Sequence, residues 1–225
     1  MHLWWEPGAA GARWAGLGPP SEADQVSVVL TVVEPPVVPR LYFWALQASF
    51  VGAGGRDVAA AHLGLQWHPE HPGSTAVNWG GYRSAGGELD GTESALPSAT
   101  GNPNTRDFAW RAGTPYRLVI RADGTGEVVD VATGATTVVR RLAVDAVGLA
   151  SPVMWSEVFA RCDDPPVAVR WSQPAPAPAA LRVTYQPAAD GGCTNTTARP
   201  DGDGVLQITN AARTVPRGSR IAIAS

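Results

Sequence analysis

Three carboxylates lie within six residues of one another, at Glu88, Asp90 and Glu93. Two carboxyl groups held about 5–5.5 Å apart can hydrolyse a glycosidic bond with retention of configuration, one as nucleophile and the other as acid and base. Gly91 and Thr92 separate these acids, and the flanking residues are small and turn-forming. Because a loop holds carboxylates poorly for catalysis, a solvated acidic loop is the alternative interpretation.

A second group of candidates lies between residues 61 and 82. Successive side chains of a strand point to opposite faces. The leucines and the tryptophan of residues 61–68 share one face, which must be the core side, and this leaves Gln66 and His68 on the other face. Asn78 lies on the polar face of the next predicted strand, and Tyr82 lies at its rim.

Amide and imidazole groups next to aromatic rings are suited to binding sugars, because apolar ring faces stack while hydroxyls need polar partners. With Trp110 nearby, the sequence predicts a ligand-binding face formed by Gln66, His68, Asn78 and Tyr82. The alternative is a solvated sheet face. Trp67 and Trp79 are predicted to be core residues.

A third candidate is the segment from Trp155 to Arg161. Trp155, Glu157 and Phe159 share one strand face, so the glutamate lies between two aromatic rings. Arg161 follows on the same face and could pair with Glu157. The segment is therefore either part of a ligand groove, through Trp155, Glu157 and Arg161, or a structural ion pair at a sheet edge.

No histidine or cysteine spacing indicates a metal site, and no phosphate loop or serine nucleophile motif occurs in the chain. The sequence therefore predicts no cofactor and no metal. The formal net charge of -3, with 16% charged residues, gives no basic surface for nucleic acid or anionic membranes. No apolar run is long enough to cross a bilayer as a helix.

The elements that must position these residues are strands. Runs rich in β-branched and aromatic residues, bounded by Gly, Pro, Asn or Asp, recur along the chain, and no sustained helical period is present. Strands are predicted at 25–34, 40–51, 61–68, 75–82, 108–110, 116–122, 126–131, 136–142, 153–161 and 167–172, with shorter ones at 181–186, 205–209 and 220–224. The expected fold is all-β: a two-sheet antiparallel, jelly-roll-like sandwich with a short β-rich C-terminal appendage.

Domain boundaries follow from composition. Residues 1–172 form the predicted sandwich, residues 173–180 (QPAPAPAA) a Pro/Ala linker, and residues 181–225 an appendage packed on the sandwich. Cys162 and Cys193 lie on either side of the linker, and an even cysteine count without a CxxC motif favours a disulfide between them. Such a bond favours a secreted or extracytoplasmic protein, although the absence of a signal peptide leaves a cytoplasmic location open.

The segment 108–129 (FAWRAGTPYRLVIRADGTGEVV) resembles a recurring strand pair of concanavalin A-like sandwiches, the lectin and glucanase superfamily. Gly64, Leu65 and Gln66, followed by Trp79, resemble consecutive strands in a bacterial branch of that superfamily. The resemblance covers roughly residues 25–172. It implies a sandwich whose concave face or rim loops hold glycans.

The spacing of the three acids also resembles the catalytic strand of one glucanase family in this superfamily. The resemblance implies that Glu88 is a nucleophile, Glu93 an acid/base and Asp90 a group that tunes their protonation. That family has aliphatic or aromatic residues between its carboxylates, whereas this chain has Gly91 and Thr92.

The sequence thus predicts a non-enzymatic domain that binds carbohydrate or another cell-surface polymer. Two alternatives stay open at this point. One is a glycan-active or small-molecule enzyme, a hydrolase or lyase that uses carboxylates in the concave cleft. The other is a structural or interaction module. A glycan or small molecule is the expected partner in the first two cases.

Overall fold

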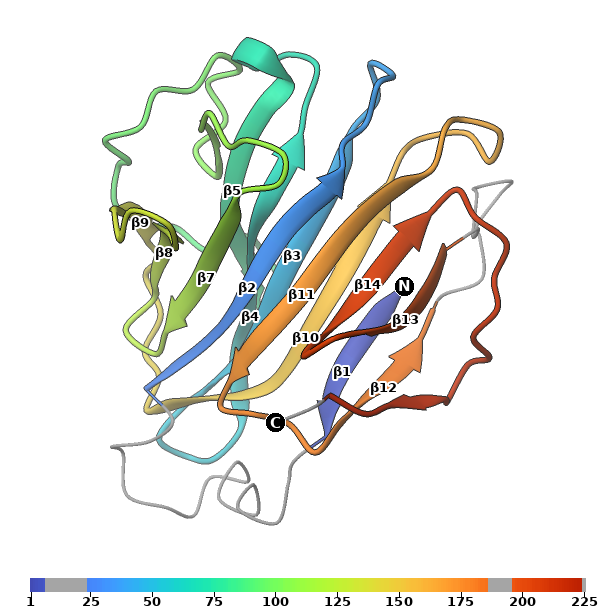
Figure 1. Cartoon of the computed structure of the whole chain (residues 1–225). Coiled ribbons are helices and arrows are strands. Elements are labelled where there is room, and N and C mark those ends of the chain that lie inside the picture. Colours follow the sequence, from blue (N-terminus) through green and yellow to red (C-terminus); the bar gives the residue numbers. More distant parts are fainter. Residues whose placement is uncertain (7–23, 186–195, 224–225) are drawn as a thin grey trace.

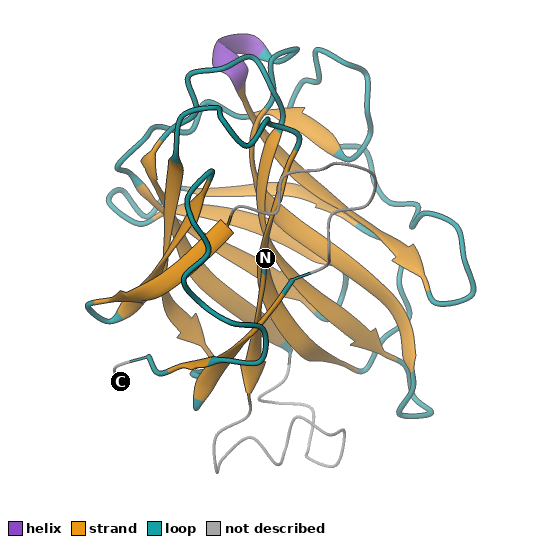
Figure 2. Cartoon of the chain, turned by 90° about the vertical axis from the view of Figure 1, so that its right-hand side faces the viewer, coloured by secondary structure: helices purple, strands orange, loops and turns teal. Residues whose placement is uncertain are grey.

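The computed structural model describes residues 1–6, 24–185 and 196–223 as two antiparallel β-sheets packed face to face (Figure 1). The prediction of an all-β sandwich is confirmed. Figure 2 shows that strands and loops account for the described chain, apart from the single 3₁₀ turn Pro72–Ser74.

The first sheet has eight strands in the order β15-β12-β1-β10-β3-β4-β5-β6. Their bounds are β1 (His2–Glu6), β3 (Tyr42–Val51), β4 (Asp57–Trp67), β5 (Thr75–Arg83), β6 (Thr105–Asp107), β10 (Gly148–Val158), β12 (Ala180–Thr184) and β15 (Arg220–Ile221). The predicted hairpin of residues 61–82 is present as β4 and β5, and β3 is central, with β10 and β4 on its two sides.

The second sheet has seven strands in the order β13-β14-β11-β2-β7-β8-β9. Their bounds are β2 (Gln25–Glu34), β7 (Pro115–Arg121), β8 (Thr125–Asp130), β9 (Thr136–Arg141), β11 (Val167–Ala175), β13 (Thr196–Asp201) and β14 (Gly204–Thr209). In Figure 1 the strands β7, β2, β11 and β14 lie in front of β4, β3, β10 and β1 of the first sheet.

One continuous core fills the space between the sheets. Every second side chain of a strand points into this core. From β1 these are Leu3 and Trp5, and from β3 they are Tyr42, Trp44 and Leu46. Trp44, Trp79 and Trp171 are fully buried there. Trp79 also donates its indole N–H to the Gly124 carbonyl oxygen over 3.0 Å, so its polar atom is satisfied inside the core.

The C-terminal segment was predicted to be a β-rich appendage packed on the sandwich. Its described residues add β12 and β15 to the eight-stranded sheet and β13 and β14 to the seven-stranded sheet. β11 extends to Ala175, which leaves only residues 176–179 as a connection. The reason is that β1 and β11 each offer a free edge of backbone groups, and pairing with the tail satisfies them.

Two further differences concern the predicted strands. Residues 108–110 form no strand; the edge strand is β6, three residues earlier, and Trp110 is buried in the core. β1 and β13 were not predicted, because their short runs carry too little local signal. The predicted partner of Cys162, Cys193, lies outside the described residues, and Cys162 is not a free cysteine.

Candidate functional site

The outer face of the eight-stranded sheet carries a second apolar cluster that is separate from the core. Along β3, Tyr42, Trp44 and Leu46 point inward, so Phe43 and Ala45 point outward. They pack with Val153 and Trp155 of β10, and Trp4 lies against them. These four side chains are at most 9% exposed, so it is the residues around them on this face that form the candidate site.

Aromatic rings organise this cluster. The Phe43 and Trp155 rings meet edge to face, with centroids 5.0 Å apart at 79°. The imidazole of His62 lies 5.6 Å from each of them. Burial lowers the pKa of His62 to about 4, so the ring is neutral at physiological pH. The Trp155 indole N–H donates to Gln47 Oε1 over 3.1 Å, which leaves the Gln47 amide group as a donor.

A row of outward side chains crosses three strands at one end of the cluster. Glu157 of β10 pairs with Phe43 of β3, and Phe43 pairs with Gln66 of β4. Neighbouring strands lie about 4.8 Å apart, so the row is roughly 10 Å wide. Partial burial raises the pKa of Glu157 above its usual value, although the residue is exposed at the surface of the sheet.

Two amide oxygens on the same face have no partner. Gln66 is buried and its Oε1 accepts no hydrogen bond among the described residues. Asn78 donates from Nδ2 to Thr105 Oγ1 over 2.8 Å, yet its buried Oδ1 also accepts none. A buried acceptor without a donor costs about 1–3 kcal/mol, so these oxygens favour a ligand that brings N–H or O–H groups.

Gly64 makes the close packing of this face possible. A Cβ at this position would overlap the Trp44 carbonyl oxygen and would lie 2.8 Å from Cε2 of Phe43. The absent side chain therefore lets the Phe43 ring lie against β4. We call the six polar and aromatic residues on this surface the outer-face cluster: Phe43, His62, Gln66, Asn78, Trp155 and Glu157.

Five of the eight residues predicted from the sequence project from this outer face: Gln66, Asn78, Tyr82, Trp155 and Glu157. Four of them belong to the outer-face cluster. Tyr82 does not, because it pairs with Ala60, six residues along β4 from Gln66 and thus about 20 Å away. It is 56% exposed at the far end of the sheet.

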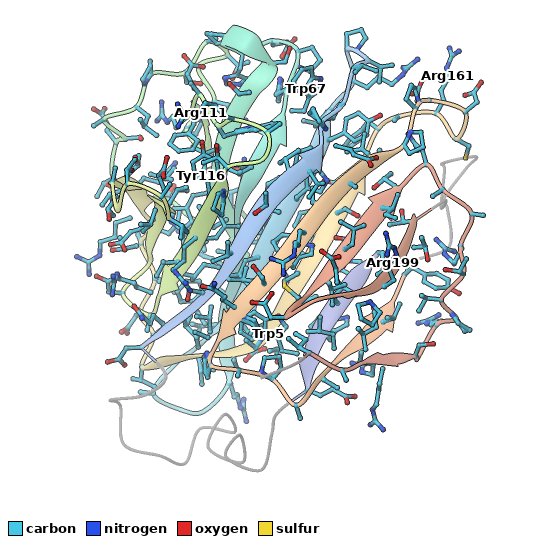
Figure 3. The ribbon with its side chains drawn as sticks, in the orientation of Figure 1. Trp5, Trp67, Arg111, Tyr116, Arg161 and Arg199 are labelled. Carbon is cyan, nitrogen blue, oxygen red and sulfur yellow. The ribbon has the colours of Figure 1, made fainter. Side chains whose placement is uncertain are left out.

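The other three predicted residues lie elsewhere. His68 is in the connection after β4, where its ring meets that of His71 at 4.7 Å. Trp110 is in the core and donates its indole N–H to the backbone oxygen of Gln66. It therefore fixes the backbone of Gln66 from the core side of the sheet. Figure 3 shows Arg161 in the β10–β11 connection, where its backbone N–H donates to Asp164 Oδ2.

The possible ion pair between Arg161 and Glu157 does not form among the described residues. β10 ends at Val158, so Arg161 belongs to a turn and no longer follows the alternation of the strand.

The acidic motif is also separate from the outer-face cluster. Glu88 forms a bridge with Tyr82, and Asp90 Oδ2 accepts from Arg83 Nη2 over 2.8 Å. Asp90 also lines an open pocket of about 420 Å³, together with Asp123 and Arg141. Because Tyr82 and Glu157 lie at opposite ends of the sheet, Glu88 and Glu157 do not converge, and the pair of carboxylates needed for glycoside hydrolysis is not formed between them.

Sequence reasoning missed Phe43 and did not select His62 as a site residue. The signal for Phe43 is the unbroken apolar run of residues 41–46, since a strand that is apolar on both faces must be covered on both. Among the described residues, no group of three histidine, cysteine or acidic side chains lies close enough to hold a metal ion. Nor does any described helix have the length and apolar character to cross a bilayer.

No protein-family model matches the chain, and no curated protein is similar to it at a significant level. Solved structures are similar in fold. Scytalido-glutamic peptidase with a peptide-based transition-state analogue aligns at TM-score 0.48 and 12% identity, over 92% of this chain and 95% of that chain. SCP-B, a member of the eqolisin family of peptidases in complex with the tripeptide Ala-Ile-His, aligns at TM-score 0.44 and 12% identity, over 83% and 92%.

These comparisons correct two predictions. The similar structures are peptidases, which contradicts a non-enzymatic carbohydrate-binding domain and the expectation that the protein is not an enzyme. The resemblance to concanavalin A-like proteins holds at the level of the two-sheet sandwich. At 12% identity the similarity concerns architecture, so the activity must be argued from the residues of the outer face.

Proposed function

We propose that the protein is a hydrolase that binds amide-containing, peptide-like molecules on the outer face of its eight-stranded sheet, with Glu157 as the proton-transferring residue. The observation that carries the proposal is the placement of Glu157 in one row with the unpartnered amide oxygen of Gln66, across the Phe43 ring. We also propose that the scaffold is of the concanavalin A-like type, as the strand motifs around Gly64 and Trp79 suggest.

The recognition chemistry favours a molecule with N–H groups and an apolar side chain. In the described part of the chain, the oxygens Gln66 Oε1 and Asn78 Oδ1 both lack a donor, and a peptide offers backbone N–H groups at regular spacing. The Phe43 and Trp155 rings, 4% and 9% exposed, form apolar packing beneath these acceptors. The amide donors of Gln47, which bind no acceptor among the described residues, face the same side and can bind a substrate carbonyl.

The protonation states suit hydrolysis near or below neutral pH. Burial raises the pKa of Glu157, which makes its carboxylate a stronger base than an ordinary glutamate. In the proposed step, the Glu157 carboxylate takes a proton from an attacking water while the water oxygen bonds to the substrate carbonyl carbon. Glu157 then gives that proton to the leaving nitrogen as the C–N bond breaks, so the residue returns to its starting form.

The test is cleavage of a mixed library of internally quenched peptides between pH 3 and pH 8, with products identified by mass spectrometry. We expect the wild-type protein to cleave peptides with an apolar or aromatic residue near the scissile bond, and Glu157→Gln to lose at least 100-fold in kcat/KM. Glu34→Gln, an exposed glutamate at the end of β2 on the other sheet, is the matched control and should retain activity.

Two results would reject the proposal. One is the absence of any cleavage by wild-type protein across the pH range. The other is equal cleavage by wild-type protein and Glu157→Gln. Fluorescence of the wild-type tryptophans during peptide titration adds a direct measure of binding, because Trp155 lies on the proposed surface.

A further inference from the structure

A second unusual feature lies at one edge of the sandwich, away from the outer-face cluster. β6 is the last strand of the eight-stranded sheet and β9 is the last strand of the seven-stranded sheet. Both lie on the same side of the molecule, where β5 packs near β9 (Figure 1). The loop between β5 and β6 covers this edge, where Gly91 forms a bridge with Leu142 just after β9.

Two arginines point into this edge from opposite sheets. Arg106 of β6 pairs with Val77, a core residue, so its side chain turns toward the inside of the sandwich. Arg140 of β9 pairs with Gly126, whose Cα faces the Trp79 ring in the core. Pairing partners in a sheet point to the same face. The two guanidinium groups thus enter the same space between the sheets.

Neither guanidinium has an anionic partner. Arg140 is 5% exposed, and its Nη1 donates only to two neutral oxygens, Pro103 O at 2.8 Å and Asn104 Oδ1 at 3.0 Å. The Nε atoms of Arg106 and Arg140 are both buried without an acceptor. Within the described part of the chain, no carboxylate forms an ion pair with either residue.

The nearby acidic groups are engaged by other residues. Asp90 is close enough to favour the charged form of Arg140, but its carboxylate binds Arg83. Asp107 follows Arg106 in the chain, and its carboxylate binds His71. Burial, and after it the positive charge of Arg106, lowers the pKa of Arg140. A buried guanidinium and a half-buried one therefore lie together with incomplete compensation of their charge, which is costly for a folded protein unless an anion is supplied.

We propose that Arg106 and Arg140 form a binding site for a tetrahedral oxyanion of phosphate size at the edge between β6 and β9, beside the loop that joins β5 to β6. Guanidinium groups present planar sets of N–H donors that match the oxygens of phosphate and sulfate, and two of them from opposite sides can share one anion. Gly91 packs directly on the guanidinium of Arg140, where a side chain would overlap Nη2. The bound anion links the two sheets next to the bridge between Gly91 and Leu142.

The probe is inorganic phosphate, compared with sodium chloride at equal ionic strength. At phosphate concentrations about 100-fold above the dissociation constant, we expect the unfolding temperature of the wild-type protein to rise by roughly 5–10 °C. The Nε–H NMR resonances of Arg106 and Arg140 should shift in a saturable way. Arg141→Gln is the matched control, because Arg141 is the exposed neighbour of Arg140 and lies beside Asp123.

Arg106→Gln should abolish the phosphate-dependent rise while keeping the protein folded, since Arg106 is the less buried of the two. Arg140→Gln is the second variant, and its fold is checked by circular dichroism before titration. The proposal is overturned if phosphate stabilises the wild-type protein no more than chloride does, or if Arg106→Gln responds like the wild-type protein. Equal or greater stabilisation by acetate overturns the tetrahedral assignment, whereas an equal response to sulfate supports it.

Discussion

Nδ1 of His71 lies 2.5 Å from Oδ1 of Asp107, which joins the connection between β4 and β5 to the edge strand β6. The His71 side chain is fully buried, and the same Asp107 oxygen accepts the backbone N–H of Ala99 over 3.1 Å. This pair therefore holds the loop before β6 against the sheet, next to the Asn78–Thr105 hydrogen bond of the outer face.

Asp107→Asn should destabilise the fold by about 1.5–3 kcal/mol, because it removes a charged acceptor from a buried imidazole. Burial alone would raise the pKa of Asp107, but the hydrogen bonds from Ala99 and His71 outweigh it and hold the pKa below its usual value. A lowered carboxyl pKa stabilises the fold above the unfolded value of 3.8, and that contribution is lost as pH falls below it. Urea unfolding at pH 7 and pH 3 measures both effects.

Glu70 precedes His71 in the chain and is exposed, so Glu70→Gln is the control for this experiment. If Asp107→Asn and Glu70→Gln change the free energy of unfolding equally at pH 7, the pair does not stabilise the loop.

Gly64→Ala tests the packing between β3 and β4 under the outer-face cluster. The added Cβ would overlap the Trp44 carbonyl and come within 2.7 Å of the Ala45 Cα, and neither backbone atom can move aside cheaply. We expect a loss of roughly 1–3 kcal/mol in the free energy of unfolding. Gly54→Ala, where a Cβ meets no atom within 4 Å, should change it little. Similar losses in both variants would contradict the close approach of β3 to β4.

The lowered pKa of His62 is expected to make the stability of the fold depend on pH. Its pKa is lowered to about 4 by burial, against 6.5 in the unfolded chain. Between these values the unfolded state binds a proton that the folded state does not, so stability falls as pH drops from about 6.5 to about 4. His62→Gln should reduce this fall by on the order of 1–3 kcal/mol. The comparison is made by urea unfolding, and identical pH profiles for the two proteins would show that His62 is not buried in its neutral form.

Glu157 is expected to change stability with pH in the opposite direction to His62. Because its pKa is raised, the folded state holds the proton more tightly than the unfolded state, and stability falls as pH rises through the pKa of Glu157. Glu157→Gln should therefore unfold at a higher temperature than wild-type protein at pH 7 and at the same temperature near pH 3. Differential scanning calorimetry checks this, with Glu34→Gln as the unchanged reference. A stabilising substitution that removes activity is typical of a functional residue.

The same carboxyl group sets the pH dependence of the proposed reaction. The base form of Glu157 is required, so kcat/KM should rise with pH and reach half its maximum above the ordinary glutamate value of 4.5. Initial rates on the best peptide of the library give this profile. A midpoint at or below 4.5 would assign the proton transfer to a different group.

Local patterns in the sequence determined the class of fold and the faces of its long strands. The strand Gln25–Glu34 was predicted with its observed bounds, and the hairpin of β4 and β5 followed from alternation and the Pro-Gly turn between them. Alternation also placed Gln66 and Asn78 on the face opposite the core. These features depend on neighbouring residues in the chain, which is why a single sequence is sufficient for them.

Only the tertiary structure decided which residues meet across strands. Phe43 separates Gln66 from Glu157 because β3 lies between β4 and β10, and no pattern within one strand specifies that order. Arg106 and Arg140 lie on different sheets and come together only at the shared edge of the sandwich. Pairing between distant strands is set by the packing of the whole core, so the chemistry at both sites depends on contacts that no local segment encodes.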